Sequence, residues 1–123
     1  MIQGVVNARH EAVIRLRVRG PSGVESDVDV IVDSGFSSSL TLPMAVVTTL
    51  NLARQSGGTA VLAEGTVRQF DIFAAEVGWG GPWRPVLVSA IGNEHLLGMH
   101  LMGGHKLVVE VVPGGLVEIL PLT

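Results

Sequence analysis

The chain of 123 residues has no cysteine, few charged residues and no long hydrophobic run. The absence of cysteine excludes disulfide bonds and catalysis by a thiol. No apolar stretch reaches the roughly 18 residues of a membrane-spanning helix. Residues 1–10 lack a basic segment leading into a long apolar one, so they are not predicted to be a signal peptide. We therefore expect a cytoplasmic protein that does not enter a membrane.

Positive charge is also scarce. Eight Lys and Arg residues stand against 11 Asp and Glu residues, which gives a formal net charge of −3. A surface that binds nucleic acid needs a cluster of basic side chains. This charge balance therefore argues against DNA and RNA as partners.

Apolar residues, in contrast, are abundant. They make up 47% of the chain, and the mean hydropathy of +0.49 is high for a protein of this size. The length fits one domain over residues 1–123. Because a small monomer would struggle to bury so much apolar surface, we expect part of it to lie in a subunit interface.

Short runs rich in Val and Leu alternate with turns rich in Gly and Pro. This pattern predicts an all-β barrel or sandwich. The expected strands cover residues 14–19, 27–32, 38–42, 59–63, 66–77, 84–90, 106–112 and 116–120. A helical turn is expected over residues 44–50, and a second short helix after Gly98. Gly57 and Gly58 are expected to interrupt the chain before the strand at 59–63.

The register of the first predicted hairpin can be derived from its charges. If the numbers of paired residues sum to 44, each arginine faces an acidic residue, and apolar residues pair on the opposite face. The expected pairs are Arg15 with Asp29, Arg17 with Asp27 and Arg19 with Glu25. We interpret this stripe as the solvated face of a hairpin rather than as a phosphate-binding strip.

The second strand of this hairpin ends in a carboxylate. The run 28–32 leads directly into Asp33, Ser34 and Gly35. At Ile31 the outward face also becomes apolar, so the strand is expected to be buried on both faces just before Asp33. A carboxylate in that position indicates a functional site. The same triplet is also common as a turn in which Asp caps its own backbone.

Further motifs follow this triplet in a specific order. Phe36 completes an Asp-Ser-Gly-Phe segment, and Leu-Thr-Leu-Pro occupies residues 40–43. A hairpin tip with Glu64 and Gly65 lies about midway along the chain. Leu-Leu-Gly-Met follows at residues 96–99. Together these features resemble the retropepsin-like aspartic proteases, in particular their small prokaryotic members with a D-[ST]-G-F motif.

Two residues depart from the pattern of those relatives. Ser34 stands where threonine is commoner, and His100 stands where an acidic residue usually follows the Gly-Met pair. Neither change removes the carboxylate. The role that the acidic residue has in the relatives is not carried over to His100.

The resemblance implies a closed or partly open retropepsin-like acid-protease β-barrel with one short helix, assembled as a homodimer. It implies an aspartic endopeptidase that uses no cofactor and acts on a peptide or protein. Asp33 of each subunit would supply one of two catalytic carboxylates. Ser34 would hydrogen-bond across the dimer axis, and Gly35 would let the backbone come close to the substrate.

The resemblance also gives roles to more distant residues. Leu97 and Gly98 would pack behind the loop that carries Asp33. The hairpin around Glu64 and Gly65 would be the flap that closes over a substrate. For Phe36 two positions are open, either lining the cleft or filling the core beneath it.

Two other functions are weighed against this one. The same fold could serve as a non-catalytic dimeric module that binds a peptide or protein. A small dimeric antitoxin-like or regulatory β protein is the third possibility.

Other chemistry has less support from the sequence. His95, His100 and His105 are five residues apart, which does not place them on one helix face as metal ligands. Residues 37–39 are serines but lack the pattern of a serine-hydrolase nucleophile. Trp79 and Trp83 lie in a loop rich in Gly and Pro, and we expect half-buried packing there rather than an anchor for a partner.

Overall fold

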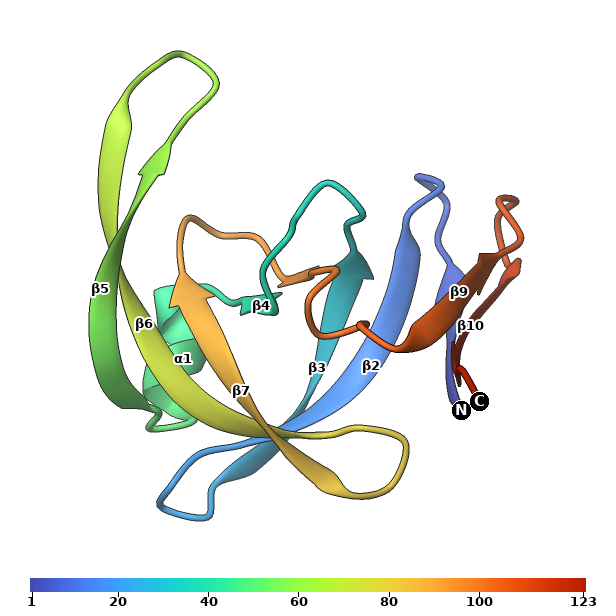
Figure 1. Ribbon diagram of the computed structural model, residues 1–123, viewed down its shortest axis with the longest axis horizontal. Helices are drawn as coiled ribbons and strands as arrows, with labels where there is room; N and C mark the ends of the chain where they lie inside the picture. The colour runs from blue at the N-terminus through green and yellow to red at the C-terminus, as the bar shows by residue number, and fades with distance from the viewer.

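Ten strands form one strongly bent sheet in the computed structural model, which describes residues 1–123 (Figure 1). The strands are β1 (Ile2–Val6), β2 (Ala12–Arg19), β3 (Glu25–Val32), β4 (Leu40–Thr41), β5 (Ala53–Val61), β6 (Val67–Gly78), β7 (Trp83–Ala90), β8 (Leu96–Leu97), β9 (His105–Val109) and β10 (Leu116–Pro121). The helix α1 (Met44–Thr49) confirms the helical turn predicted there. No helix has the length and apolar character needed to cross a membrane.

The strand order explains the barrel. It runs β5-β6-β7-β4-β8-β3-β2-β1-β10-β9, and β2 also pairs with β6 through Val18–Val77 and Arg19–Glu76. This extra pairing bends the sheet back onto itself and leaves β5 and β9 as free edges. The predicted all-β, partly open barrel with one short helix is therefore confirmed.

The core lies inside this bend. Alternate residues of the β2–β3 hairpin point inward, as the sequence predicted, and Ile14, Val18 and Val30 are fully buried. Leu97 of the short central strand β8 is buried with them. Burying such side chains stabilises the fold by about 1.5–3 kcal/mol each.

The predicted register of the β2–β3 hairpin is confirmed, because the two residue numbers of each of the seven pairs sum to 44. Arg15 pairs with Asp29 at 2.9 Å and Arg17 with Asp27 at 3.2 Å. The Arg15 guanidinium, chiefly through its hydrogen bond, lowers the pKa of Asp29 below its ordinary value.

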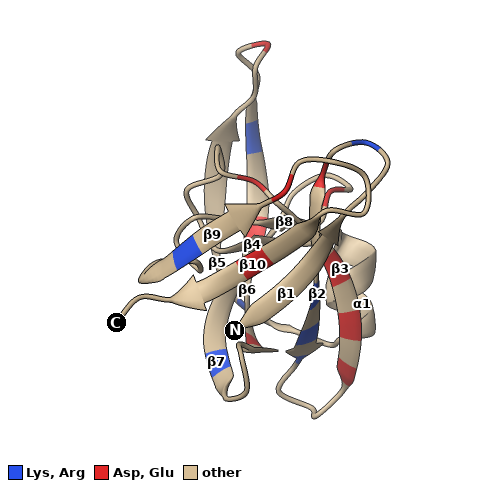
Figure 2. Cartoon of the chain, turned by 90° about the vertical axis from the view of Figure 1, so that its right-hand side faces the viewer, with Lys and Arg blue, Asp and Glu red and all other residues tan.

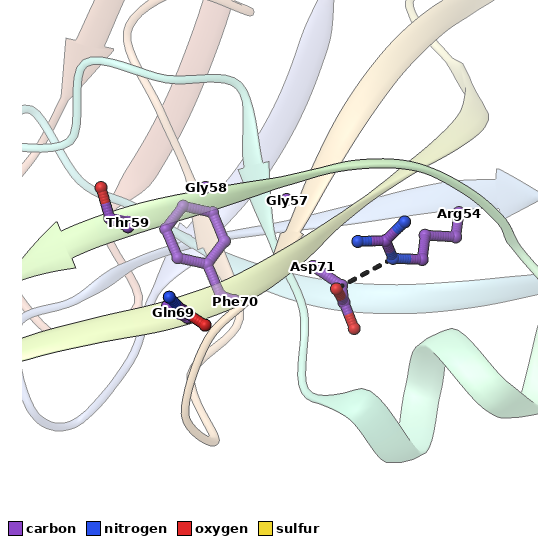
Figure 3. Close-up of a pocket in the computed structure, with 7 residues that line it drawn as sticks. All are labelled: Arg54, Gly57, Gly58, Thr59, Gln69, Phe70 and Asp71. Carbon is purple, nitrogen blue, oxygen red and sulfur yellow. Dashed lines mark hydrogen bonds and ion pairs between the residues drawn. The ribbon is translucent and has the colours of Figure 1, made fainter.

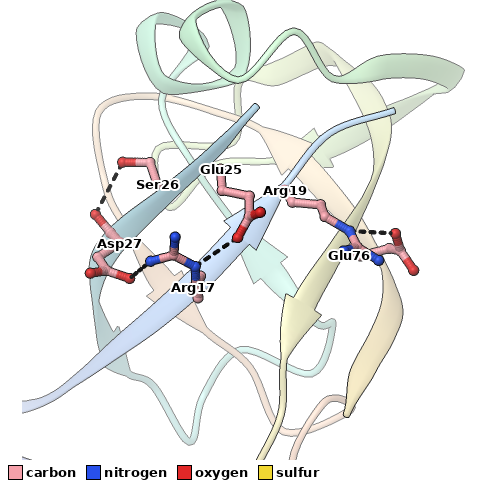
Figure 4. A network of polar contacts seen from close by, with 6 residues as sticks. All are labelled: Arg17, Arg19, Glu25, Ser26, Asp27 and Glu76. Carbon is pink, nitrogen blue, oxygen red and sulfur yellow. Dashed lines mark hydrogen bonds and ion pairs between the residues drawn. The ribbon is translucent and has the colours of Figure 1, made fainter. Parts of the chain in front are cut away.

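Arg19 lies opposite Glu25 as predicted, but the two side chains do not form an ion pair with each other. Glu25 instead accepts a hydrogen bond from Arg17 at 2.7 Å (Figure 4). Arg19 contacts Glu76 of β6 at 3.0 Å and lies over the ring of Trp83 at 4.0 Å. The contact between β2 and β6 supplies these partners, and the hairpin pattern alone gave no sign of it.

The short helix predicted after Gly98 is also wrong. Residues 99–104 form turns instead, closed by bonds from Gly103 N–H to the His100 carbonyl and from His105 N–H to the Met102 carbonyl. These bonds span three residues, one fewer than in an α-helix. Gly104 adopts a φ of 77°, which a helix cannot continue through.

Gly57 and Gly58 do not interrupt the chain as predicted, because both lie inside β5. The strand bulges between Arg54 and Ser56 and then continues to Val61. The ring of Phe70 on β6 lies against Gly58, where an added Cβ would come within 2.7 Å of it. The neighbouring aromatic ring thus supplies the packing that glycine lacks.

Candidate active site

Asp33 lies directly after β3, at the centre of the sheet. Its backbone N–H donates to the carbonyl of Leu97 at 2.9 Å, which extends the parallel pairing of β3 with β8 by one residue. Its own carbonyl accepts from the N–H of Phe36 at 3.1 Å and closes a turn. The carboxyl group is therefore attached to backbone that is hydrogen-bonded to a central strand, while the residue is only half-buried.

The Asp33 carboxylate has one oxygen occupied and one free. Oδ1 accepts the backbone N–H of Gly35 at 2.9 Å, and Oδ2 makes no hydrogen bond within the chain. The side chain therefore caps its own turn, as one interpretation of the triplet predicted, and its second oxygen is left without a partner in the chain. Ser34 and Gly35 are exposed beside it.

The segment around Gly98 holds this turn from behind. Gly98 N–H donates to the Ser39 carbonyl at 2.9 Å, Met99 N–H to the Phe36 carbonyl at 2.8 Å and His100 N–H to the Ser38 carbonyl at 3.2 Å. A Cβ on Gly98 would overlap the carbonyl of Ser38 and come within 2.7 Å of the Phe36 ring. Only glycine fits there.

Phe36 takes neither of the two positions considered for it. It does not line the groove that holds Asp33, and it is not part of the hydrophobic core. Its half-buried ring packs against Gly98 instead. Sequence reasoning missed Ser38 and Ser39 as parts of this support. Both act through backbone carbonyls, which leave no signal in residue type.

Asp33 and Ser34 open into a groove of about 1180 Å³. Apolar side chains from four strands line it, namely those of Val5, Val13, Ile31 and Leu96. Its rim carries charged and polar groups of the β1–β2 turn, including Arg9 and Glu11. The groove could accept an extended chain with apolar side chains, with Asp33 at one side.

Glu64 and Gly65 lie at the tip of the β5–β6 hairpin. The tip is closed by bonds from Gly65 N–H to the Leu62 carbonyl and from Leu62 N–H to the Thr66 carbonyl, both 2.8 Å. Gly65 has a φ of 86°, which favours glycine. Neither residue lines the groove that holds Asp33, and the hairpin stands apart from the β3–β4 loop in Figure 1.

A separate hollow of about 590 Å³ lies on the β5–β6 hairpin itself (Figure 3). Phe70 is its one hydrophobic lining residue, and Arg54 bonds to Asp71 at 2.9 Å along one wall. Its one carboxylate, that of Asp71, is ion-paired with Arg54 and lies inside a strand rather than on a loop after one. We therefore place the candidate site at Asp33.

The histidines have separate surroundings. His105 accepts the indole N–H of Trp79 at 3.2 Å and contacts the Gly103 carbonyl at 2.9 Å. His100 is exposed, and the buried Nδ1 of His95 has no hydrogen-bond partner. No group of three or more His, Cys, Asp or Glu side chains is placed to hold a metal ion.

The two tryptophans pack within the fold. Trp79 is almost fully buried, and Trp83 is half-buried beneath Arg19. This agrees with the packing role expected from the sequence.

The bent sheet and the Asp-Ser-Gly turn supported by a Leu-Leu-Gly strand define a retropepsin-like fold. Among solved structures, the chain is similar to a retropepsin-like aspartic protease from Rickettsia conorii. The two share 19% sequence identity with a TM-score of 0.61, over 97% of this chain and 88% of that one. No protein-family model and no curated protein matches the sequence. The likeness confirms the resemblance at the level of the fold.

Proposed function

We propose that this chain is an aspartic endopeptidase that works as a homodimer, with Asp33 of each subunit forming the catalytic pair. One observation carries the proposal. Asp33 lies on a turn held by backbone bonds to β8, and its Oδ2 is free in a groove large enough for a peptide. The fold shared with a solved aspartic protease supports it.

The proposed chemistry needs two carboxyl groups that share one proton. Two carboxylates about 3 Å apart cannot both ionise, so one is protonated and the other charged. The charged Asp33 takes a proton from a water molecule while that water attacks the scissile carbonyl carbon. The protonated partner donates to the carbonyl oxygen. The carbon–nitrogen bond then breaks as the amine takes the proton that Asp33 removed from the water, and the diol returns a proton to the partner carboxylate, so no covalent intermediate with the enzyme forms.

The residues around Asp33 have supporting roles in this proposal. Ser34 hydrogen-bonds across the dimer axis to the equivalent loop of the partner subunit. Gly35 keeps Asp33 oriented, because its N–H donates to the Asp33 carboxylate. Leu97 and Gly98 hold the loop in place. The hairpin with Glu64 and Gly65 closes over the bound peptide, excludes water and adds backbone hydrogen bonds to it as a neighbouring strand.

The test is peptide cleavage by the purified chain and by Asp33→Asn, followed by mass spectrometry across pH 3–8. The variant keeps the size of the side chain and the bond from Gly35 but cannot share a proton. We expect cleavage to fall at least about 1000-fold, since a general acid–base pair is removed. Cleavage retained in Asp33→Asn would contradict the proposal.

The alternative function is a dimeric module that binds peptides without cleaving them. It would be favoured if the wild-type chain bound peptides in the groove and released them intact at every pH. A folded, active wild type excludes it.

A further inference from the structure

A further hollow, here called the Arg84 hollow, borders the β3–β4 loop that begins with Asp33. It has a volume of about 730 Å³ and shares no lining residue with the groove at Asp33. Its walls come from the β3–β4 loop, from β5, β6 and β7, and from the turns after Gly98. A ligand in the Arg84 hollow would therefore leave the groove free.

The lining of the Arg84 hollow contains basic groups and no carboxylate. Arg84 and His100 are its ionisable residues, and neither takes part in the ion pairs of the structure. The strand β7 has one coloured band in Figure 2, because Arg84 is its only charged residue. The chain as a whole has a net charge of −3. A hollow with only basic groups therefore favours an anion as its ligand.

Arg84 is a half-buried cation without a counter-ion. Its Nη1 donates to the Leu101 carbonyl at 3.1 Å, and its guanidinium lies 5.9 Å from the ring centre of Trp79. The other N–H groups of the guanidinium have no partner in the chain. The other arginines outside ion pairs, Arg9 and Arg68, are exposed to water. Because a charge removed from water costs free energy unless an opposite charge is near, the position of Arg84 favours a bound anion.

Ser39 is a second polar residue of this wall whose side chain has no partner. It is only 8% exposed, and it lines the Arg84 hollow. Its backbone carbonyl accepts the N–H of Gly98 at 2.9 Å, but its hydroxyl makes no hydrogen bond within the chain. A buried hydroxyl without a partner costs free energy. The hydroxyl of Ser39 is therefore available to a ligand in the hollow, independently of the charge on Arg84.

Backbone bonds hold these polar residues close to one another. His100 N–H donates to the Ser38 carbonyl at 3.2 Å, which joins the turns after Gly98 to the residue before Ser39. Arg84 is bonded to the carbonyl of the residue that follows His100. The basic groups and the serine are thus held together by the fold itself, before any ligand binds.

Apolar side chains form another part of the wall. β4 pairs in parallel with β7 through Leu40 and Val88, so one residue earlier Ser39 lies beside Leu87. Leu87 is 53% exposed, and it lines the hollow together with Val86. An apolar group bound there would remove Leu87 from water. The ligand that fits this wall has an apolar body next to its charged group.

We propose that the Arg84 hollow binds a carboxylate carried on a small apolar body. Arg84 pairs with the carboxylate, for which the planar guanidinium is well suited. The hydroxyl of Ser39 donates to the same group, and Leu87 covers the apolar part. The single permanent charge in the lining matches a carboxylate better than a doubly charged phosphate. The inference does not involve Asp33, so it holds whether or not the chain is a protease.

The test is a titration followed by NMR of the backbone amides. A free organic acid, isovalerate, is compared with its neutral twin isovaleramide, and the capped dipeptide acetyl-Leu-Glu-amide with acetyl-Leu-Gln-amide. We expect the carboxylates to shift the signals of residues 37–39 and 100–101 and the neutral twins to leave them unchanged. The tighter of the two carboxylates identifies the source of the ligand as a free acid or an acidic residue of a peptide.

Variants then assign the binding to named side chains. Arg84→Gln should weaken carboxylate binding at least about tenfold, because a charge-assisted hydrogen bond is lost. Ser39→Ala should weaken it about threefold. Arg68→Gln is the matched control, since it removes an exposed arginine that has no ion pair, and it should bind as the wild type does. Circular dichroism checks that each variant is folded.

The inference is overturned if neither carboxylate shifts these signals, or if the neutral twins shift them equally. It also fails if Arg84→Gln binds as tightly as Arg68→Gln, or if the signals that move are those around Asp33. Should Arg84→Gln not fold, Ser39→Ala decides, because an unchanged affinity in that variant contradicts the proposed contact.

Discussion

The two long hairpins of this molecule differ in how they are held. The β2–β3 hairpin lies in the middle of the sheet, buries one face in the core and ends in Asp33. The β5–β6 hairpin lies at a free edge, and from residue 61 to residue 67 its side chains are almost all exposed. In the proposed function, the group that must be positioned for chemistry is attached to the first hairpin, and the segment that moves over a substrate belongs to the second.

The largest effect is expected from Gly98→Ala, in the segment that supports the Asp33 loop. The added Cβ overlaps the Ser38 carbonyl and the Phe36 ring, so the loop that carries Asp33 must shift. We expect a loss of about 2–4 kcal/mol of stability and loss of cleavage at temperatures where the protein is still folded. Gly57→Ala is the control, since its Cβ would meet no atom closer than 3.5 Å. Urea unfolding of both variants measures the difference, and equal stability would contradict the supporting role of Gly98.

Truncating one valine in each hairpin compares how much each hairpin contributes to the free energy of unfolding. Val30 of β3 is fully buried and Val61 of β5 is 74% exposed. Val30→Ala should cost about 2 kcal/mol in the free energy of unfolding, whereas Val61→Ala should stay within about 0.5 kcal/mol. Thermal unfolding measured by calorimetry compares them. Similar losses in both would show that the β5–β6 hairpin is also part of the cooperative core.

The smallest effect is expected from the ion pairs on the central hairpin. Because Arg15 lowers the pKa of Asp29 in the folded chain, this pair stabilises the fold above the ordinary pKa of Asp, near 3.9. The contribution is lost as the pH falls through the lowered pKa. The Asp29 side chain is 54% exposed, so water screens the pair and Arg15→Gln should lower the Tm at pH 6 by about 2 °C or less.

That difference between Arg15→Gln and the wild type should shrink at pH 2 and in 1 M salt. Arg9→Gln is a control in a turn, since Arg9 makes no ion pair in the structure. A difference that grows in acid would contradict the assignment.

Much of the central hairpin could be predicted from the sequence, and the reasons are local. Its register follows from charges and apolar residues that alternate along two adjacent strands. The turn at Asp33 follows from the apolar run that ends there. By contrast, Arg19 bonds to Glu76, 57 residues away in sequence, and no local pattern reports such a partner.

The other wrong predictions from the sequence also involve contacts with residues that are distant in the chain. The chain after Gly98 reads as a short helix by residue type, but the backbone bonds to residues 36–39 and the glycines at 103 and 104 hold it in turns. Gly57 and Gly58 remain in a strand because Phe70 covers one of them from the next strand. At the candidate site, the sequence shows the Asp-Ser-Gly triplet. It does not show the backbone carbonyls of residues 36, 38 and 39 that hold the triplet's loop in place.

The charged ladder on β2 and β3 meets the groove only at Asp29, yet its register determines which face of β3 carries Asp33. A slip of one residue in this hairpin would exchange the two faces of β3, so that Ile31 and Asp33 turned toward the barrel interior and Val30 toward water. It would also separate Arg15 from Asp29 and Arg17 from Asp27. A hairpin paired in that way would contain every residue of the candidate site and have the Asp33 carboxyl group on the wrong face of the sheet.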